Sequence, residues 1–175
     1  DCRNMSKALW VHKVTGEFGL PKVYKPSQTV RELRKLFAQY GNLNKYICKL
    51  KNNIQSTLMD NGVVLSADDK SDLFSQKTSD VIFSKLDISI ASKISIEISL
   101  DILWNVEEKK KLLTNEIIKA GISIEKEVKL LISIKGITPL SALAFLSDVG
   151  DVRRFKTLRK MNAYLGLVPR IKESG

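Results

Sequence analysis

A long helical repeat of apolar residues in the first half of the chain restricts the fold more than any other feature. The repeat steps by three, four or seven residues and comprises Val30, Leu33, Phe37, Tyr40, Ile47, Leu50, Ile54 and Leu58. Thr29 and Glu32 form a capping-box pair before it, and Gly62 suits the left-handed position that ends a helix. The pattern therefore predicts one amphipathic helix over residues 29–61.

The isoleucine-rich stretch that follows fits two kinds of structure. An alternating pattern with the period of a strand is formed by Ile88, Ile90, Ile94, Ile96, Ile98 and Leu100. A helical stripe is formed by Ala91, Ile94, Ile98, Ile102, Val106, Leu113, Ile117 and Ala120, and Gly121 follows it. The stripe continues for about eight turns without a turn signal, and this length favours the helix. Two such helices are expected to pack antiparallel as a projecting coiled-coil arm, which serves either assembly or structure alone.

The charge of the chain favours a polyanionic partner. Its 175 residues include 29 Lys and Arg against 19 Asp and Glu, a net charge of +10. Because neutralised phosphates release counterions, such an excess is typical of proteins that bind nucleic acid, although a solvated basic protein is the alternative. The basic residues of the first helix lie largely off its apolar stripe and either contact phosphates or face water: Arg31, Arg34, Lys35, Lys45, Lys49 and Lys51.

Other residue counts narrow the chemistry. His12 is the single histidine, which argues against His-based metal sites and Ser-His-Asp triads. Cys2 and Cys48 form no disulfide framework, as expected for a reduced, cytoplasmic protein. No apolar run approaches the length of a membrane span, so we expect no membrane partner.

An acidic run between the two predicted helices has two interpretations. It contains Asp68, Asp69, Asp72 and Asp80. Such a cluster could hold a cation, but it lacks the ordered spacing and the glycine of a calcium loop. Acidity at a helix start or in a loop is favoured.

The N-terminal region predicts a short helix over residues 1–11 and then a short β-like stretch at Val23 and Tyr24, which Pro26 ends. One short strand is not stable alone. We therefore expect its partner strands elsewhere in a longer protein.

The last third of the chain has the layout of a helix-hairpin-helix. An apolar helix end at residues 130–134 runs into a turn at Gly136, then Thr138 as N-cap and Pro139 as first helical residue, with Gly150 at the far end. A glycine turn of this kind points backbone amides at a DNA phosphate, aided by the positive helix N-terminus. Thr138 replaces the usual second glycine, and a packing hairpin is the alternative.

Basic residues crowd the segment beyond Gly150. They are Arg153, Arg154, Lys156, Arg159, Lys160, Arg170 and Lys172. Together with Gly136 and Thr138, these residues are the candidate DNA contacts.

A second short helix is predicted in this segment after Thr157. Its expected buried face consists of Leu158, Met161 and Leu165, and Gly166 ends it. The aromatic rings of Phe155 and Tyr164 either stack on bases or lie in a small core.

The run "IKGITPLSALAFLSDVGDVRRFKTLRKMNAYLGLVPRIKESG" closely resembles the C-terminal domain of the IS110-type insertion-sequence transposases. That group includes the Piv-type DNA invertases and the RNA-guided bridge recombinases. The matching positions are Gly136, Ala142, Gly150, Asp151, Arg154, Phe155, Tyr164, Gly166, Leu167, Pro169, Ser174 and Gly175. "VYKPSQTVRELRKL" is similar to the family's strand-to-helix passage, and "DCRNMSKAL" to the end of its RNase-H-like (RuvC-like) domain.

The resemblance implies a mainly α chain with three regions. Residues 1–28 would be the C-terminal remnant of a RuvC-like α/β domain, residues 29–127 the long antiparallel coiled-coil arm, and residues 128–175 a truncated C-terminal transposase domain with the helix-hairpin-helix. On this interpretation the chain is an internal fragment of a larger protein.

The resemblance also implies a chemistry. Family members hold Mg²⁺ with four carboxylates, D-E-D-D, while a serine attacks the DNA backbone and becomes joined to the phosphate. Asp1 matches the third carboxylate and would be a metal ligand, and Ser174 matches the nucleophile. Asn4 stands at the fourth carboxylate position, where it offers a carbonyl but no charge. Without the first two carboxylates the chain itself is expected to be inactive.

The function implied for the parent protein is site-specific DNA recombination that mobilises an insertion sequence. Its expected partners are DNA, a guide (bridge) RNA, and a second copy bound through the helical arm, in the cytoplasm of a bacterium or archaeon. The alternative is a non-catalytic helical module for DNA binding or assembly.

Overall fold

The computed structural model describes residues 2–16 and 24–167. Within these ranges the chain forms helices and no strand, which confirms a mainly α fold there. Tyr24, expected in a β-like stretch, lies in an irregular segment, and Val23 lies outside the described residues. The chain divides into two compact units, one of residues 28–149 and one of residues 1–27 with 150–175.

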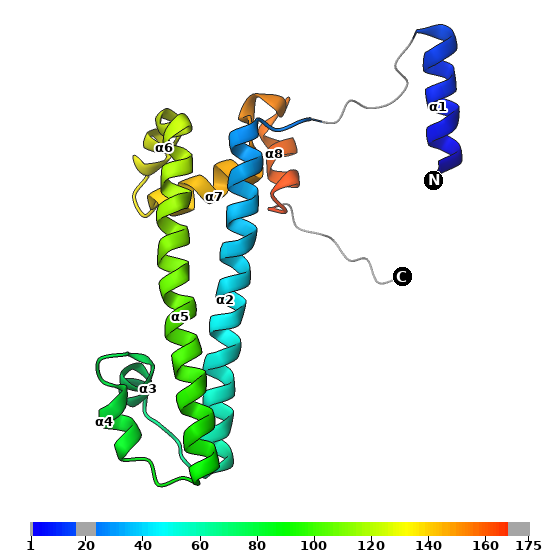
Figure 1. Cartoon of the computed structure of the whole chain (residues 1–175). Coiled ribbons are helices and arrows are strands. Elements are labelled where there is room, and N and C mark those ends of the chain that lie inside the picture. Colours follow the sequence, from blue (N-terminus) through cyan, green and yellow to red (C-terminus); the bar gives the residue numbers. More distant parts are fainter. Residues whose placement is uncertain (1, 17–23, 168–175) are drawn as a thin grey trace, which may run out of the picture. The chain divides into compact units, whose positions relative to one another are not determined.

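Two long antiparallel helices, α2 (Gln28–Asp60) and α5 (Ile90–Ala120), lie side by side and form the body of the 28–149 unit (Figure 1). With a rise of 1.5 Å per residue, α2 is about 50 Å long. Beyond its end Gly62 adopts φ 74°, the left-handed conformation expected there. The prediction of two long helices packed antiparallel is therefore confirmed. No helix in the described ranges has both the length and the apolar character needed to cross a membrane.

The start of α2 differs from the prediction. The helix begins at Gln28, so Thr29 lies inside it instead of capping it. The hydroxyl of Thr29 pairs with that of Ser123 at 3.2 Å, and the carboxylate of Glu32 accepts a hydrogen bond from the Gln28 amide at 2.9 Å. The capping-box interpretation is wrong, because Thr29 has a tertiary partner in η1 (Gly121–Ile124).

One hydrophobic core lies at the end where α3 (Ala67–Phe74) and α4 (Ser79–Ser84) connect α2 to α5 (Figure 1). Its buried members are Ile47, Ile54, Leu58, Leu73, Ile82, Leu86, Ile96, Leu100 and Leu103. The hydroxyl of Ser66 accepts the Asp69 amide at 3.1 Å and donates to the Asp69 carboxylate at 2.7 Å. The acidic run thus supplies the first turn of α3, as its favoured interpretation predicted.

A second core lies at the other end of the helix pair, where α6 (Glu125–Ile132) and α7 (Pro139–Val149) pack. Its buried members are Leu33, Ile117, Val128, Ala142, Leu143 and Leu146. Arg34 ties α2 to the end of α7, since its Nε donates to the Ser147 carbonyl at 2.7 Å and its Nη2 to the Asp148 carbonyl at 3.0 Å. Because the last four carbonyls of an α-helix have no amide four residues further on within the helix, Arg34 acts as a cap from another element.

Between the two cores the apolar side chains of the helix pair are only partly buried. No residue of α2 between Leu33 and Ile47 is buried, and none of α5 between Leu103 and Ile117. A hollow of about 270 Å³ lies in this stretch, lined by Leu43, Asp101, Ile102, Asn105, Val106 and Lys109. We call this middle part of the helix pair the waist.

In its first half, α5 buries a different face from the one that the stripe indicated. Ile94, Ile98 and Ile102 are 52%, 54% and 47% exposed, whereas Ile96, Leu100 and Leu103 are buried. Isoleucine and leucine occupy both sides of the helix here, so the period alone could not decide which side packs. The packing of α2, α3 and α4 on one side decided it. Later in the stripe, Ile117 is buried as expected.

Gly121 makes a close approach that yields a test of the second core. A Cβ added there would overlap the Leu143 side chain, which is only 2% exposed and has no room to move. We predict that Gly121→Ala lowers the free energy of unfolding by about 1–3 kcal/mol, measured by urea denaturation followed by circular dichroism.

Gly41→Ala is the matched control. Gly41 lies in the middle of α2 and a Cβ there would meet nothing within 4 Å. Because alanine favours a helix over glycine, this variant should gain about 0.5–1 kcal/mol. Equal stability of the two variants would contradict the close packing of Gly121 on Leu143.

Candidate nucleic-acid interface

The turn between α6 and α7 contains the glycine and the cap that the sequence predicted, while α6 ends at Ile132 and the helix-hairpin-helix stays a prediction. Gly136 adopts φ 95°, and the space around its α-carbon is open. The Thr138 hydroxyl accepts the Ser141 amide at 3.2 Å, while the Ser141 hydroxyl accepts the Thr138 amide at 2.8 Å. Pro139 is the first residue of α7, so its position and the cap by Thr138 are confirmed. Phosphate binding by this turn stays a prediction.

The other predicted contacts that the structure describes lie in the second unit, on η2 (Val152–Arg154), on α8 (Leu158–Tyr164) and, for Lys156, between these two elements. The Thr157 hydroxyl accepts the Lys160 amide at 3.3 Å, which confirms the expected cap of α8. Gly166, with φ 72°, follows the helix as predicted.

The expected buried face of α8 is only partly present. Met161 and Leu165 are half-buried, but Leu158 is 68% exposed. Leu158 is the first residue of the helix, directly after its cap. The spacing of the apolar residues indicated a buried side but did not show that this first residue would be exposed.

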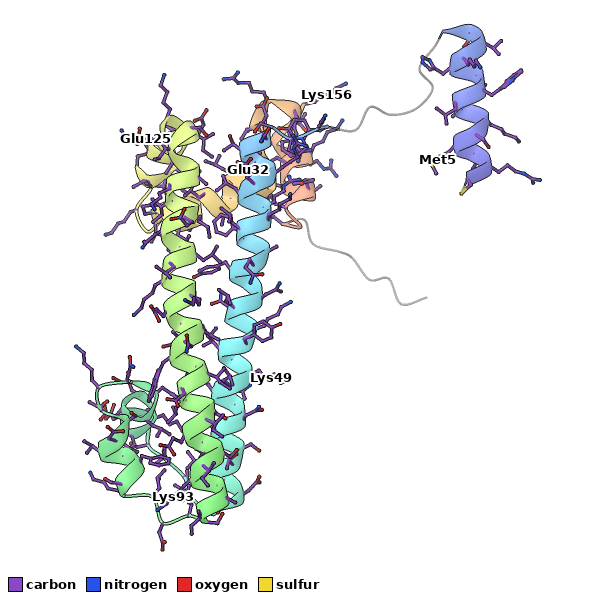
Figure 2. The ribbon with its side chains drawn as sticks, viewed as in Figure 1. Met5, Glu32, Lys49, Lys93, Glu125 and Lys156 are labelled. Carbon is purple, nitrogen blue, oxygen red and sulfur yellow. The ribbon has the colours of Figure 1, made fainter. Side chains whose placement is uncertain are left out.

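Four cationic side chains of this segment are exposed: Arg153, Lys156, Arg159 and Lys160 (Figure 2 labels Lys156). None of the four forms a salt bridge with another described residue. Arg170 and Lys172 lie outside the described residues.

Arg154 has different surroundings from these four. Its guanidinium carbon lies 4.7 Å from the ring centre of Tyr24, 4.2 Å from that of Phe155 and 4.4 Å from that of Tyr164. The rings of Phe155 and Tyr164 are themselves 5.3 Å apart. A planar guanidinium in contact with several aromatic faces gains cation–π attraction that a flexible ammonium does not match. We call Arg154 and the three aromatic residues Tyr24, Phe155 and Tyr164 the Arg154 cluster.

Tyr24 also fixes the start of the basic segment. Its hydroxyl accepts a hydrogen bond from the Asp151 amide at 3.0 Å. Gly150 adopts φ 66°, and a Cβ there would lie 3.0 Å from the Tyr24 hydroxyl oxygen. Glycine is therefore required at this position both by the left-handed backbone and by the approach of Tyr24. Sequence reasoning missed Tyr24, because no local pattern links it to a segment so distant along the chain.

The predicted catalytic residues are placed only in part. Asp1 and Ser174 lie outside the described residues, and Asn4 is exposed on α1 (Cys2–Thr15). In the part of the chain that the structure describes, no three His, Cys, Asp or Glu side chains gather where they could hold a metal ion. Because the predicted ligand Asp1 is not among the described residues, the Mg²⁺ site stays a prediction, and we derive no step through the metal.

Comparison with known proteins finds that the C-terminal segment of the chain is similar to transposases. Residues 128–175 match the family model described as the Transposase IS116/IS110/IS902 family. This part of the chain is similar to that family, which confirms the resemblance inferred from the sequence.

Two curated relatives that match the chain are named as transposases. The chain is 40% identical over 58 residues to a probable family 20 transposase of Pseudomonas aeruginosa PAO1, a match that covers 33% of this chain and 17% of the relative. It is 37% identical over 60 residues to the transposase for insertion sequence element IS1111A of Coxiella burnetii RSA 493, covering 34% and 16%. The matched part is thus about one sixth of each relative's length. No solved structure matches the chain.

The Arg154 cluster predicts an effect of shape as distinct from charge. Arg154→Lys keeps the positive charge but loses the planar contact with the three rings. We expect the Asp151 amide, which donates to Tyr24, to exchange its hydrogen about tenfold faster in this variant, corresponding to about 1.4 kcal/mol. Arg153→Lys, the same change at an exposed neighbour, should leave that exchange rate unaltered. Unchanged exchange in Arg154→Lys would show that only its charge matters.

Proposed function

We propose that the protein is part of a DNA transposase that mobilises an insertion sequence by cleaving and rejoining DNA strands. The observation that carries this proposal is the match of residues 128–175 to the transposase family. The matched region is only 17% and 16% of the length of the two relatives. Cleavage and rejoining are therefore proposed for a whole transposase of which this chain is a part.

The role proposed for the described residues is DNA binding through phosphates. The exposed cations Arg153, Lys156, Arg159 and Lys160 supply charge without internal ion pairs among the described residues. In the 28–149 unit, the open space beside Gly136 leaves the backbone of that turn accessible to a phosphate, next to the N-terminus of α7 that Thr138 caps. The two surfaces lie in different units and are proposed independently.

The strand-cleavage step proposed for a whole transposase uses Ser174. Its hydroxyl oxygen would attack a phosphorus of the DNA backbone, form a serine–phosphate ester and release the departing sugar oxygen, which takes up a proton. Reversal of this step by another strand end would rejoin the DNA without loss of bond energy. The Mg²⁺ and the guide RNA are implied by the family resemblance alone, and they enter the test as added components.

The test is the capture of a covalent protein–DNA adduct. The chain, extended by the coding sequence on both sides of its genomic locus, is incubated with Mg²⁺, DNA of the element's ends and RNA transcribed from its flanks. We expect an adduct resistant to denaturing electrophoresis that Ser174→Ala abolishes completely. Ser84→Ala, which removes an exposed serine of α4, is the control and should form the adduct at the original level.

A failure of this experiment favours the alternative function. Salt-sensitive DNA binding without any adduct would indicate a non-catalytic DNA-binding or assembly module. An adduct that still forms in the Ser174→Ala variant would show that another residue is the nucleophile.

The proposed association of two copies through the arm has support from one surface. Ile90, Ile94, Ile98 and Ile102 are exposed at four-residue steps along α5, an apolar ridge of the kind that marks a protein interface. Sedimentation equilibrium is expected to show a dimer, and a monomer for the double variant Ile94→Lys, Ile98→Lys. The control Val64→Lys, at an exposed apolar residue outside both long helices, should remain dimeric. A monomeric parent chain would refute the proposal.

A further inference from the structure

The two long helices carry different net charges. α2 contains six basic residues, which are Arg31, Arg34, Lys35, Lys45, Lys49 and Lys51, and only two acidic ones, Glu32 and Asp60. α5 contains five basic and five acidic residues and is neutral. The excess charge of the helix pair therefore belongs to α2.

The basic residues of α2 divide into two groups by what they contact. Arg34 caps α7 through the Ser147 and Asp148 carbonyls. Lys51 pairs with Glu107 at 3.1 Å and lies over the ring of Phe74. Both side chains serve the fold.

The other four, Arg31, Lys35, Lys45 and Lys49, are exposed and form no salt bridge with any described residue. At 100° per residue these four point away from the side that carries Leu33, Ile47 and Ile54. Figure 2 shows Lys49 extending from α2 on the side away from α5. We call this surface the outer face of α2.

The outer face carries its four cations in two pairs, Arg31 with Lys35 and Lys45 with Lys49, and Glu32 is the one acidic residue between Arg31 and Lys49 in the sequence. Between Lys35 and Lys49 the helix contains no Asp or Glu, and Asn42 lies on the same side. From Arg31 to Lys49 the outer face is about 27 Å long. A DNA duplex carries one negative charge per about 1.7 Å of its axis, so this length faces about sixteen phosphates, more than enough for four cations.

We propose that the outer face of α2 binds the phosphate backbone of duplex DNA, as a third contact surface in addition to the C-terminal cations and the Gly136 turn. This proposal rests on the DNA-binding function proposed above and extends it to the long helix. Tyr46 is the one large aromatic side chain exposed on α2, so the face has no series of rings on which single-stranded bases could stack. Lysines that contact phosphates read no sequence, and the surface positions DNA without selecting its target.

The test compares three quadruple variants that each lose four cations. The first replaces the outer face: Arg31→Gln, Lys35→Gln, Lys45→Gln and Lys49→Gln. The second is the matched control on α5: Lys93→Gln, Lys109→Gln, Lys111→Gln and Lys119→Gln. The third replaces the C-terminal cations: Arg153→Gln, Lys156→Gln, Arg159→Gln and Lys160→Gln. Gln has nearly the helix propensity of Lys and Arg, and circular dichroism checks that each variant is folded.

The measurement is the affinity of the full chain for a fluorescent 30-base-pair duplex between 50 and 200 mM salt. Four lost phosphate contacts should reduce the slope of log K against log salt by about 3.6. Raising the salt from 50 to 200 mM should therefore weaken DNA binding by the outer-face variant by a factor about 150-fold smaller than it weakens binding by the parent chain. The α5 control should change the slope by less than about 1.

Each outcome decides between the proposals. Equal effects of the outer-face and α5 variants would reduce the role of α2 to general charge and overturn the inference. An unchanged slope in the outer-face variant, with a reduced slope in the C-terminal variant, would overturn it and leave the proposed function standing. A reduced slope in the outer-face variant, with an unchanged slope in the C-terminal variant, would support DNA binding by the outer face and overturn DNA binding by the C-terminal cations. Stronger binding of poly(dT) or of duplex RNA than of duplex DNA would overturn the choice of partner, and no binding by the parent chain would overturn both proposals.

Discussion

The 28–149 unit depends on the apolar stripe of α2. One end of the stripe places Leu33 in the core with α5, α6 and α7, and the other end places Ile47, Ile54 and Leu58 in the core with α3, α4 and α5. A helix of this length gains its stability mainly from such packing and only slightly from intrinsic propensity. Because the stripe occupies one side of the helix, four of its six basic residues fall on the opposite side. The same periodicity thus builds the fold and exposes the charge.

The described positions that match the transposase pattern are mostly structural in this chain. Gly150 and Asp151 contact Tyr24, while Arg154, Phe155 and Tyr164 form one stacked cluster with it. This explains why a basic residue in a basic segment need not be a DNA contact: Arg154 is held by rings, whereas its neighbours Arg153 and Lys156 are exposed. These described positions of the family pattern therefore serve to hold the loop that follows α7.

Local rules identified what local interactions determine. The helical stripe of α2, the cap by Thr138, the start of α8 at Thr157 and the left-handed glycines after helices all follow from neighbouring residues, and the structure contains them. The errors occurred where a distant partner decided the outcome. Thr29 pairs with Ser123 across the fold, and the face of α5 that packs was selected by α2, α3 and α4.

The candidate site shows the same limit. The exposed cations were found from composition, since a surplus of Lys and Arg in a short segment is visible in the sequence. The distinction between Arg154 and these cations was not, because it depends on Tyr24, which is close in space and far along the chain. Helix charge, in contrast, could be read directly: α2 is basic and α5 neutral by residue count alone.

The waist gives the helix pair an uneven bending stiffness. Its two ends are held by separate cores of buried side chains, while in the stretch that holds Gly41 the apolar side chains are only partly buried and a hollow lies beside Leu43. Close-packed interiors transmit strain, and loosely packed regions absorb it. A force applied to one end would therefore bend the pair at the middle and leave both ends undeformed, so that the two halves of the outer face of α2 could follow a curved surface as two straight segments.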